Sequence, residues 1–171
     1  MGADLYIESI SEPAAKAAKP AFDEACQRRD KRRDMLRADG LSREAIGNDA
    51  EVKAAQDDVD KAYNAMYPED GYFRDSYNVS SVLNKCGLSW WRDVTPMLRN
   101  GKLSPKKAAL LAERIEKAPL HLPTLAELEH DNADTKNGVE SWHDYYRNKR
   151  TRLIAFLRRA VELKEPIRCS L

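Results

Sequence analysis

The sequence contains little cysteine, glycine or proline, and it has no long apolar run. Its three cysteines, Cys26, Cys86 and Cys169, are far apart and form no CxxC pair or Cys/His ligand spacing. This pattern argues against a disulfide framework and a structural zinc site, and free thiols are typical of a reducing compartment. No segment approaches the roughly 18–20 apolar residues of a membrane span, and the acidic start does not match a signal peptide. We therefore expect a cytoplasmic protein without a membrane partner.

The sequence also has no surplus of charge of either sign. It contains 29 Lys and Arg and 28 Asp and Glu, which give a net charge of +1. Proteins that wrap nucleic acid usually have a clear basic surplus, so such a role would need a local patch. With 171 residues, 42% of them hydrophobic, the chain suits one domain that spans residues 1–171.

Helical periodicity is the main pattern that is present. The seven glycines and eight prolines fall between segments whose apolar residues recur at helical spacing. These segments predict helices at about 13–38, 49–66, 89–98, 104–117, 124–129 and 139–163. Residues at both ends of the chain suggest short extended arms that lie near each other. The predicted fold is all-α: a compact bundle of six or seven helices with short extended terminal arms and little room for a sheet.

The first predicted helix contains a basic cluster: Arg28, Arg29, Lys31, Arg32, Arg33 and Arg37. At about 100° per residue, Arg29 and Arg33 fall on the apolar meridian of this helix. In an antiparallel hairpin with the helix at 49–66, Arg29 would lie near Asp60 and Arg33 near Gln56. This position favours partly buried ion pairs that set the register of the hairpin. The alternative is an anion- or phosphate-binding site formed by Arg28, Arg29, Arg32 and Arg33.

An aromatic and charged segment without helical or strand periodicity follows the second helix. It contains Tyr72, Phe73, Arg74, Asp75, Tyr77 and Asn78. Aromatic, charged and amide side chains in a loop suit a recognition surface, because loops commonly carry binding residues. The alternative is a loop held to the core by Tyr72 and Phe73, with Arg74 and Asp75 as local ion-pair partners.

Two further helices contain residues that are typical of binding sites, but projection on a helical wheel favours a structural role for them. Trp90, Trp91 and Val94 fall in one arc, which predicts that both tryptophans face the core, with a dimer face as the alternative. In the helix at 139–163, arginines flank an apolar stripe on both sides, and only Lys149 interrupts the stripe. We expect a core helix with solvated basic flanks, with Lys149 extending outward to water.

Catalytic signatures are missing, since no HExxH, GxSxG, GxGxxG or GxxxxGKS/T motif occurs. Cys86 with a histidine could supply a nucleophile and base, and Asp75 with Asp93 could supply a carboxylate pair. The spacing favours neither arrangement. Whether the protein is an enzyme is therefore uncertain, with a non-catalytic role favoured, and we expect no cofactor and no metal.

Four short segments, MGADLYI, GYFRDSYN, LSWWRDV and EPIRCSL, resemble landmarks of a family of small, uncharacterised phage and bacterial proteins. The resemblance covers these segments and not the whole chain, and it brings no activity and no functional residues. It implies one expectation by analogy, because small phage-borne proteins without catalytic motifs are often binders or inhibitors of host machinery.

The leading hypothesis is a non-catalytic protein-interaction module, an inhibitor or adaptor acting on host machinery. Its contact surface would be the aromatic segment that runs from Tyr72 to Asn78. The second hypothesis is binding of nucleic acid or another phosphate ligand through the arginine cluster of the first helix. The third is a small enzyme that uses Cys86 or a carboxylate pair. The sequence specifies no oligomeric state.

Overall fold

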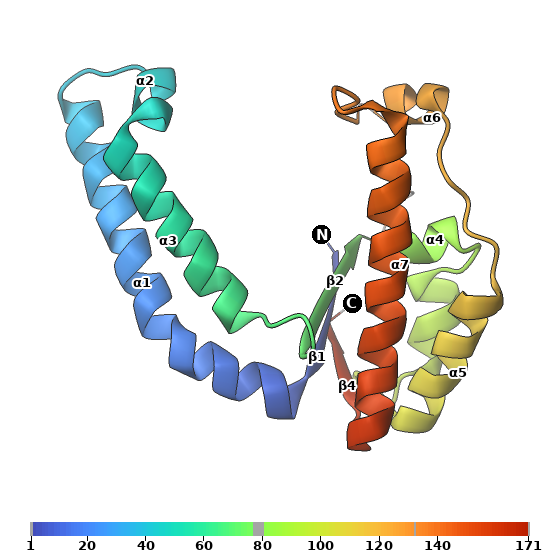
Figure 1. The fold of residues 1–171 in the computed structure, drawn as a ribbon. Coiled ribbons are helices and arrows are strands. Elements are labelled where there is room, and N and C mark those ends of the chain that lie inside the picture. Colours follow the sequence, from blue (N-terminus) through green and yellow to red (C-terminus); the bar gives the residue numbers. More distant parts are fainter. Residues whose placement is uncertain (1, 77–80, 132, 171) are drawn as a thin grey trace. The chain divides into compact units, whose positions relative to one another are not determined.

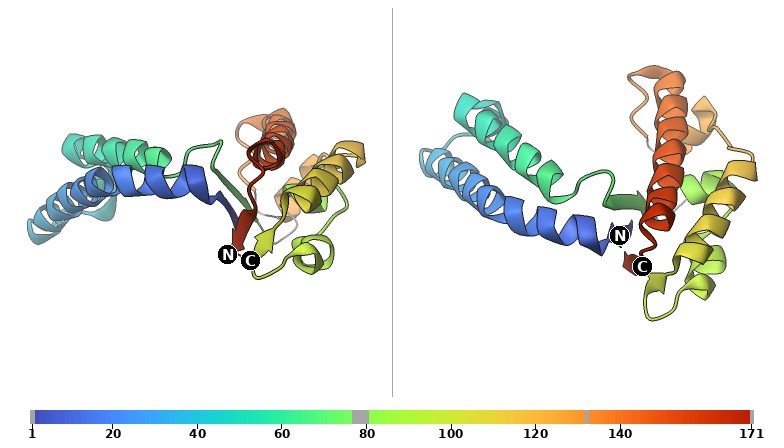
Figure 2. Two further views of the ribbon diagram at one scale, coloured as in Figure 1. Left: turned by 90° about the horizontal axis from the view of Figure 1, so that it is seen from below. Right: turned by 60° about the horizontal axis from the view of Figure 1, so that its bottom comes forward.

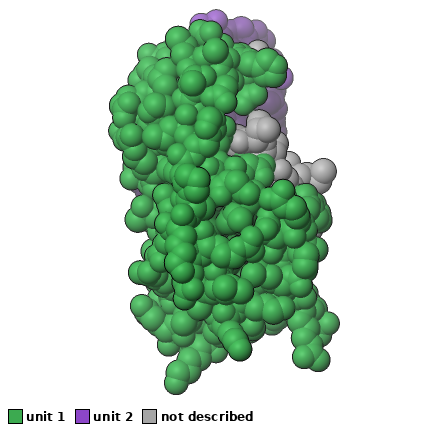
Figure 3. Space-filling model, turned by 90° about the vertical axis from the view of Figure 1, so that its right-hand side faces the viewer, with its two compact units in different colours: residues 1–8, 69–171 green, residues 9–68 purple. Residues whose placement is uncertain are grey.

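The computed structural model describes residues 2–76, 81–131 and 133–170. The chain divides into two compact units, which are coloured separately in Figure 3. Unit 1 contains Met1–Glu8 and Glu69–Leu171, and unit 2 contains Ser9–Pro68. That residues 1–171 form a single domain stays a prediction.

Unit 1 contains a four-stranded antiparallel sheet with the strand order β2-β1-β4-β3. Its strands are β1 (Gly2–Ile7), β2 (Tyr72–Ser76), β3 (Lys102–Leu103) and β4 (Ile167–Ser170). β1 pairs with β2 on one side and with β4 on the other. The first and last strands of the chain therefore lie side by side, as Figures 1 and 2 show, which confirms the prediction of neighbouring extended arms.

Helices make up much of the rest of unit 1. They are α4 (Val82–Lys85), α5 (Pro105–Lys117), α6 (Leu125–His130) and α7 (Gly138–Leu163), with a π-helical turn at Trp90–Val94 and a 3-10 turn at Thr95–Met97. α5 and α7 run side by side (Figure 1), and α7 packs against β2 of the sheet. α7 buries Leu153, Phe156 and Leu157, and the Phe156 ring lies 6.2 Å from the ring of Phe73 in β2. The apolar stripe predicted for residues 139–163 is the core face of α7.

Unit 2 is a helical hairpin. From Ser9 onward, α1 (Glu8–Ala38) runs antiparallel to α3 (Ala50–Met66), and the short α2 (Arg43–Asn48) lies between them in the chain. Leu36, Ile46 and Val52, one from each helix, form a buried apolar cluster. The hairpin predicted from the periodicity of the two long helices is therefore confirmed.

The fold differs from the sequence prediction in its sheet and in the start of its first helix. The chain is mostly helical, as predicted, but it is not all-α, because it contains four strands. These strands are short and come from segments far apart in the sequence, so no local pattern indicates their pairing. α1 begins at Glu8 and not near residue 13. Pro13 and Pro20 lie inside α1 and each removes a backbone donor, which agrees with the bend of α1 in Figure 1.

The adjacent tryptophans have different environments. Trp90 is 2% exposed, whereas Trp91 is 56% exposed. Both lie in the π-helical turn, whose i→i+5 hydrogen bonding changes the angle between successive side chains. Projection on an α-helical wheel therefore does not apply here. The prediction that both tryptophans face the core is confirmed for Trp90 and wrong for Trp91.

Glu127 closes a capping box at the start of α6. Its carboxylate accepts a hydrogen bond from the backbone N–H of Thr124 at 2.8 Å and another from Nε2 of His121 at 3.0 Å. These bonds, the backbone one first, favour the ionised form and lower the pKa of Glu127 to about 2. A carboxyl group with a depressed folded pKa contributes stability above its unfolded pKa and loses that contribution as the pH falls through the folded pKa.

The free energy of unfolding of the wild type should therefore decrease as the pH falls from about 4.5 to about 2, because Glu127 becomes protonated in this range. Glu127→Gln has no such carboxylate, so its free energy of unfolding should decrease less over the same range. Urea denaturation at a series of pH values measures this dependence. Glu129→Gln, on the same helix but outside the capping box, is the matched control and should keep the wild-type profile. A wild-type profile in Glu127→Gln would contradict the role of this carboxylate.

Candidate functional site

A row of four side chains crosses the sheet on the face opposite the helices of unit 1. The strand register places Tyr72 of β2 beside Tyr6 of β1. It places Arg168 of β4 beside Tyr6, and Lys102 of β3 beside Arg168. Side chains alternate along a strand, so these residues point away from the buried face of the sheet. We name this row, together with the neighbouring Arg74, the tyrosine–arginine face.

Aromatic rings form the centre of the tyrosine–arginine face. The ring centroids of Tyr6 and Tyr72 are 5.2 Å apart, and the rings are tilted by 44°. The guanidinium carbon of Arg168 lies 5.9 Å from the centroid of the Tyr6 ring, within the range of a cation–π contact. Both tyrosines are half-buried and Arg168 is exposed. The rings are thus held by their neighbours while part of their surface faces solvent.

Two carboxylates accompany the basic side chains of this face. Lys102 Nζ lies 2.6 Å from Oε2 of Glu8, and Arg168 Nη1 lies 3.8 Å from Oε1 of the same residue. Asp4 accepts a hydrogen bond from the Tyr72 hydroxyl at 2.5 Å. Its Oδ1 also lies 3.6 Å from Nε of Arg74. The face therefore carries mixed charge, and its basic side chains are held in place by acids from β1 and the start of α1.

On the opposite face of β2, Asp75 is 2% exposed and organises the interior of unit 1. Its carboxylate lies 3.0 Å from Nζ of Lys149 in α7. It accepts a hydrogen bond from Nε1 of Trp90 at 2.9 Å. It accepts two more from Oγ of Ser81 at 2.6 Å and the backbone N–H of Val82 at 3.1 Å. One carboxylate thus connects β2 with α4, the π-helical turn and α7.

Lys149 points inward to Asp75, so the prediction that it extends outward to water is wrong. Burial disfavours its charged form, but the charge of Asp75 and the hydroxyl of Tyr145 outweigh this effect and raise the pKa of Lys149. A charged residue that interrupts the apolar stripe of a helix is a signal of such a buried partner. The sequence contained this signal at Lys149, and the partner became evident only in the fold.

The structure separates the residues predicted as a contact surface. Tyr72 and Arg74 lie on the tyrosine–arginine face, Phe73 and Asp75 are buried at 3% and 2% exposure, and Tyr77 and Asn78 lie outside the described residues. A strand is recognised by apolar residues at every second position, but the charged Asp75 occupies one of the inward positions of β2. The sequence pattern therefore predicts a loop here. Tyr6, Lys102 and Arg168 were missed, since only strand pairing brings them to Tyr72.

In unit 2, most arginines of the predicted anion-binding cluster form ion pairs with acidic side chains of the same unit. Arg28 lies 3.1 Å from Asp58, and Arg32 lies 2.8 Å from Asp49. Arg29 binds Asp30 at 2.8 Å and Gln56 at 3.2 Å. Gln56 in turn donates to Asp60 at 2.8 Å, and the charge of Asp60 also acts on Arg29, so Asp60 lies near Arg29 as predicted but does not bind it directly. The hydrogen bonds to Asp30 and Asp49 raise the pKa values of Arg29 and Arg32.

Anion binding by Arg28, Arg29, Arg32 and Arg33 stays a prediction. An incoming phosphate would have to compete with the carboxylates that three of these arginines already bind. A pocket of about 440 Å³ lies beside Arg28, Lys31 and Arg32, but Glu51 and Asp58 also line it and would repel a phosphate.

The groups considered for catalysis do not form a site. Cys86 is 3% exposed, and burial raises the pKa of its thiol, which disfavours the nucleophilic thiolate. Asp93 pairs with Arg114 at 2.6 Å and with Arg92 at 3.1 Å, whereas Asp75 pairs with Lys149. The two carboxylates therefore have separate partners and separate structural roles.

Comparisons with known protein families, with curated proteins and with solved structures find no match to this chain. Within the described ranges, no three His, Cys, Asp or Glu side chains are grouped so that they could hold a metal ion. In the same part of the chain, no helix has both the length and the apolar composition needed to cross a membrane.

Proposed function

We propose that this protein is a non-catalytic protein-interaction module whose contact surface is the tyrosine–arginine face. One observation carries the proposal: a row of two tyrosines, an arginine and a lysine crosses all four strands on the face away from the helices of unit 1. Tyrosine and arginine are enriched among the residues that dominate binding energy at protein interfaces. A sheet held by a packed helical layer presents such side chains with little loss of conformational freedom.

The mixed charge of the face favours a protein partner over a nucleic acid. Asp4 and Glu8 lie among the basic side chains and bind them directly. A polyanion would be repelled by these carboxylates, whereas a protein surface can offer donors and acceptors to both signs of charge. The resemblance to small phage and bacterial proteins extends the proposal to an inhibitor or adaptor that acts on the machinery of a bacterial host.

Capture of proteins from bacterial extract by the immobilised protein tests this proposal. Tyr6→Ala and Arg168→Glu are expected to weaken binding of the captured partner by roughly 30-fold or more, because truncation of an interface hot spot costs about 2 kcal/mol or more. Lys106→Glu, at an exposed position of α5, is the matched control and should bind as the wild type does. Circular dichroism verifies that all three variants are folded.

The salt dependence of capture distinguishes the alternatives. A protein partner held by aromatic contacts should remain bound at high salt. If the wild type captures only nucleic acid, and only at low salt, the arginine cluster of unit 2 becomes the better candidate. Equal capture by the wild type and both face variants would show that the tyrosine–arginine face is not the contact surface.

A further inference from the structure

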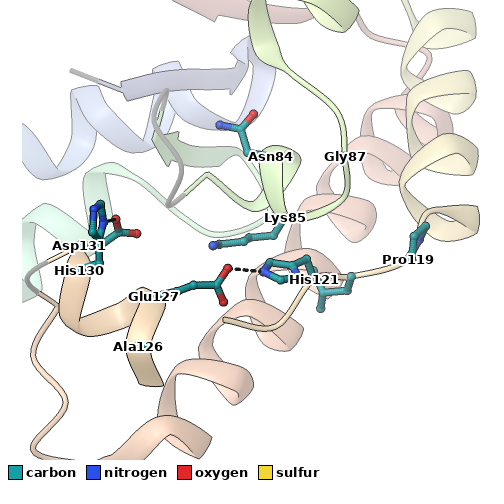
Figure 4. Close-up of a pocket in the computed structure, with 10 residues that line it drawn as sticks. Asn84, Lys85, Gly87, Pro119, His121, Ala126, Glu127, His130 and Asp131 are labelled. Carbon is teal, nitrogen blue, oxygen red and sulfur yellow. Dashed lines mark hydrogen bonds and ion pairs between the residues drawn. The ribbon is translucent and has the colours of Figure 1, made fainter. Parts of the chain in front are cut away.

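A second candidate site lies in unit 1, in a pocket of about 990 Å³ between α4, the loop after α5, and α6. Figure 4 shows the side chains that line it. The ionisable side chains among them are Lys85, His121, Glu127, His130 and Asp131. The rest of the wall is largely apolar and includes Leu120 and Ala126. The pocket thus combines a few polar groups with an apolar surface, as small-molecule sites do.

Lys85 is the unusual residue of this pocket, because it is charged and only 9% exposed. Its backbone is fixed at both ends: its N–H donates to the Ser81 carbonyl at 3.1 Å, and its carbonyl accepts from the His121 N–H at 2.7 Å. Its Nζ lies 5.5 Å from the centroid of the Tyr146 ring. In Figure 4 the side chain extends from α4 toward the part of the pocket where His130 and Asp131 lie.

Among the described residues, no carboxylate forms an ion pair with Lys85, whose ammonium group lies near the Tyr146 ring. Lys149, which is also largely buried, lies 3.0 Å from Asp75. The Lys85 side chain is mostly buried and lines the pocket, and no carboxylate neutralises its ammonium group there, so this position suits an anion supplied by a ligand.

The acidic residues of the pocket already have partners of their own. Glu127 binds His121 at 3.0 Å and the Thr124 backbone at 2.8 Å. Asp131 Oδ1 lies 3.4 Å from Nδ1 of His130. Lys85 is therefore the one basic side chain of this pocket, among the described residues, that has no carboxylate within ion-pair distance.

We propose that the pocket binds a small organic acid. Lys85 forms an ion pair with the carboxylate of this ligand, and the apolar wall of the pocket contacts its hydrocarbon part. A lysine ammonium is a compact point charge that matches one carboxylate. A doubly charged phosphate is less suitable, because Glu127 and Asp131 would repel its second charge. The inference concerns a site separate from the tyrosine–arginine face and does not depend on the proposed function.

Titration of the full chain with sodium hexanoate, followed by calorimetry and by protein NMR, tests this inference. Hexanoate should bind, and Lys85→Met should weaken its binding by at least about tenfold, because a charge-assisted contact is lost. Lys106→Met, an exposed lysine of α5 outside the pocket, is the matched control and should bind hexanoate as the wild type does. Ala126→Trp leaves Lys85 in place and fills the pocket, so it should also abolish binding.

Four results would overturn the inference. The first is equal binding of neutral hexanamide, which would show that the ammonium group is not the anchor. The second is binding of inorganic phosphate in preference to hexanoate, which would refute the carboxylate class. The third is unchanged binding by Ala126→Trp, which would place the ligand elsewhere and remains informative even if Lys85→Met fails to fold. The fourth is a wild type that binds no hexanoate.

Discussion

Replacing Asp75 by alanine is expected to lower the free energy of unfolding by about 3–5 kcal/mol, because it leaves a buried ammonium group without its partner. The substitution also removes the acceptor of Trp90 Nε1, of the Ser81 hydroxyl and of the Val82 N–H. Each of these donors would remain in the interior without the bond that compensates its lost hydration. Urea denaturation followed by circular dichroism measures the change.

The surface pair Arg147–Asp144 provides a matched control, because its atoms are also 3.0 Å apart. Its side chains are 48% and 63% exposed, whereas those of Lys149 and Asp75 are 14% and 0% exposed. Asp144→Ala should therefore cost no more than about 1 kcal/mol, since exposed ion pairs contribute little. Similar losses for Asp75→Ala and Asp144→Ala would refute the central role of Asp75.

A double-mutant cycle isolates the contribution of the buried pair. Lys149→Met alone should also be strongly destabilising, because it leaves the Asp75 carboxylate buried without a cation. The double variant Asp75→Ala, Lys149→Met should then be less destabilised than the sum of the single variants. Additive losses would mean that the two side chains act independently.

The second large effect is expected at Arg150, which holds the end of α5 against α7. Its Nη2 lies 2.7 Å, 2.9 Å and 3.0 Å from the carbonyl oxygens of Ile115, Glu116 and Ala118. The last carbonyls of a helix have no partner within the helix, and a cation near them is also favoured by the helix dipole. Arg150→Met should lower the free energy of unfolding by about 2–3 kcal/mol, measured by urea denaturation.

Arg147→Met is the matched control for this prediction, because Arg147 lies on the same helix and forms ion pairs with two exposed carboxylates, Glu140 and Asp144. It should cost less than about 1 kcal/mol. Arg150→Lys should recover part of the lost stability, since an ammonium group can still donate to one or two of the carbonyls. A loss at Arg150 no larger than the loss at Arg147 would show that these three bonds do not support the end of α5.

The two proposed sites can be tested separately because they share no residue. The tyrosine–arginine face is formed by the strands, whereas the Lys85 pocket is formed by α4, α6 and the loop after α5. Lys85→Met should leave capture of a protein partner unchanged, and Arg168→Glu should leave hexanoate binding unchanged. Loss of both functions in a single folded variant would instead indicate that the sites are coupled.

The sequence by itself determined the features that depend on neighbours along the chain. The helix predicted at 104–117, which is α5, the apolar stripe of α7 and the hairpin of α1 and α3 all followed from local patterns in the sequence. These features are predictable because a helix satisfies its own hydrogen bonds and reveals its buried face as a periodic pattern.

Only the tertiary structure decided which distant segments meet. β1 pairs with β2 and β4 across most of the length of the chain, and this pairing places Tyr6 beside Tyr72 and Arg168. Asp75 could be recognised as a core residue only when Lys149, Trp90 and Ser81 were seen around it. The physical reason is that a buried charge is stable only with partners that the fold supplies, and the sequence around Asp75 does not contain all of them.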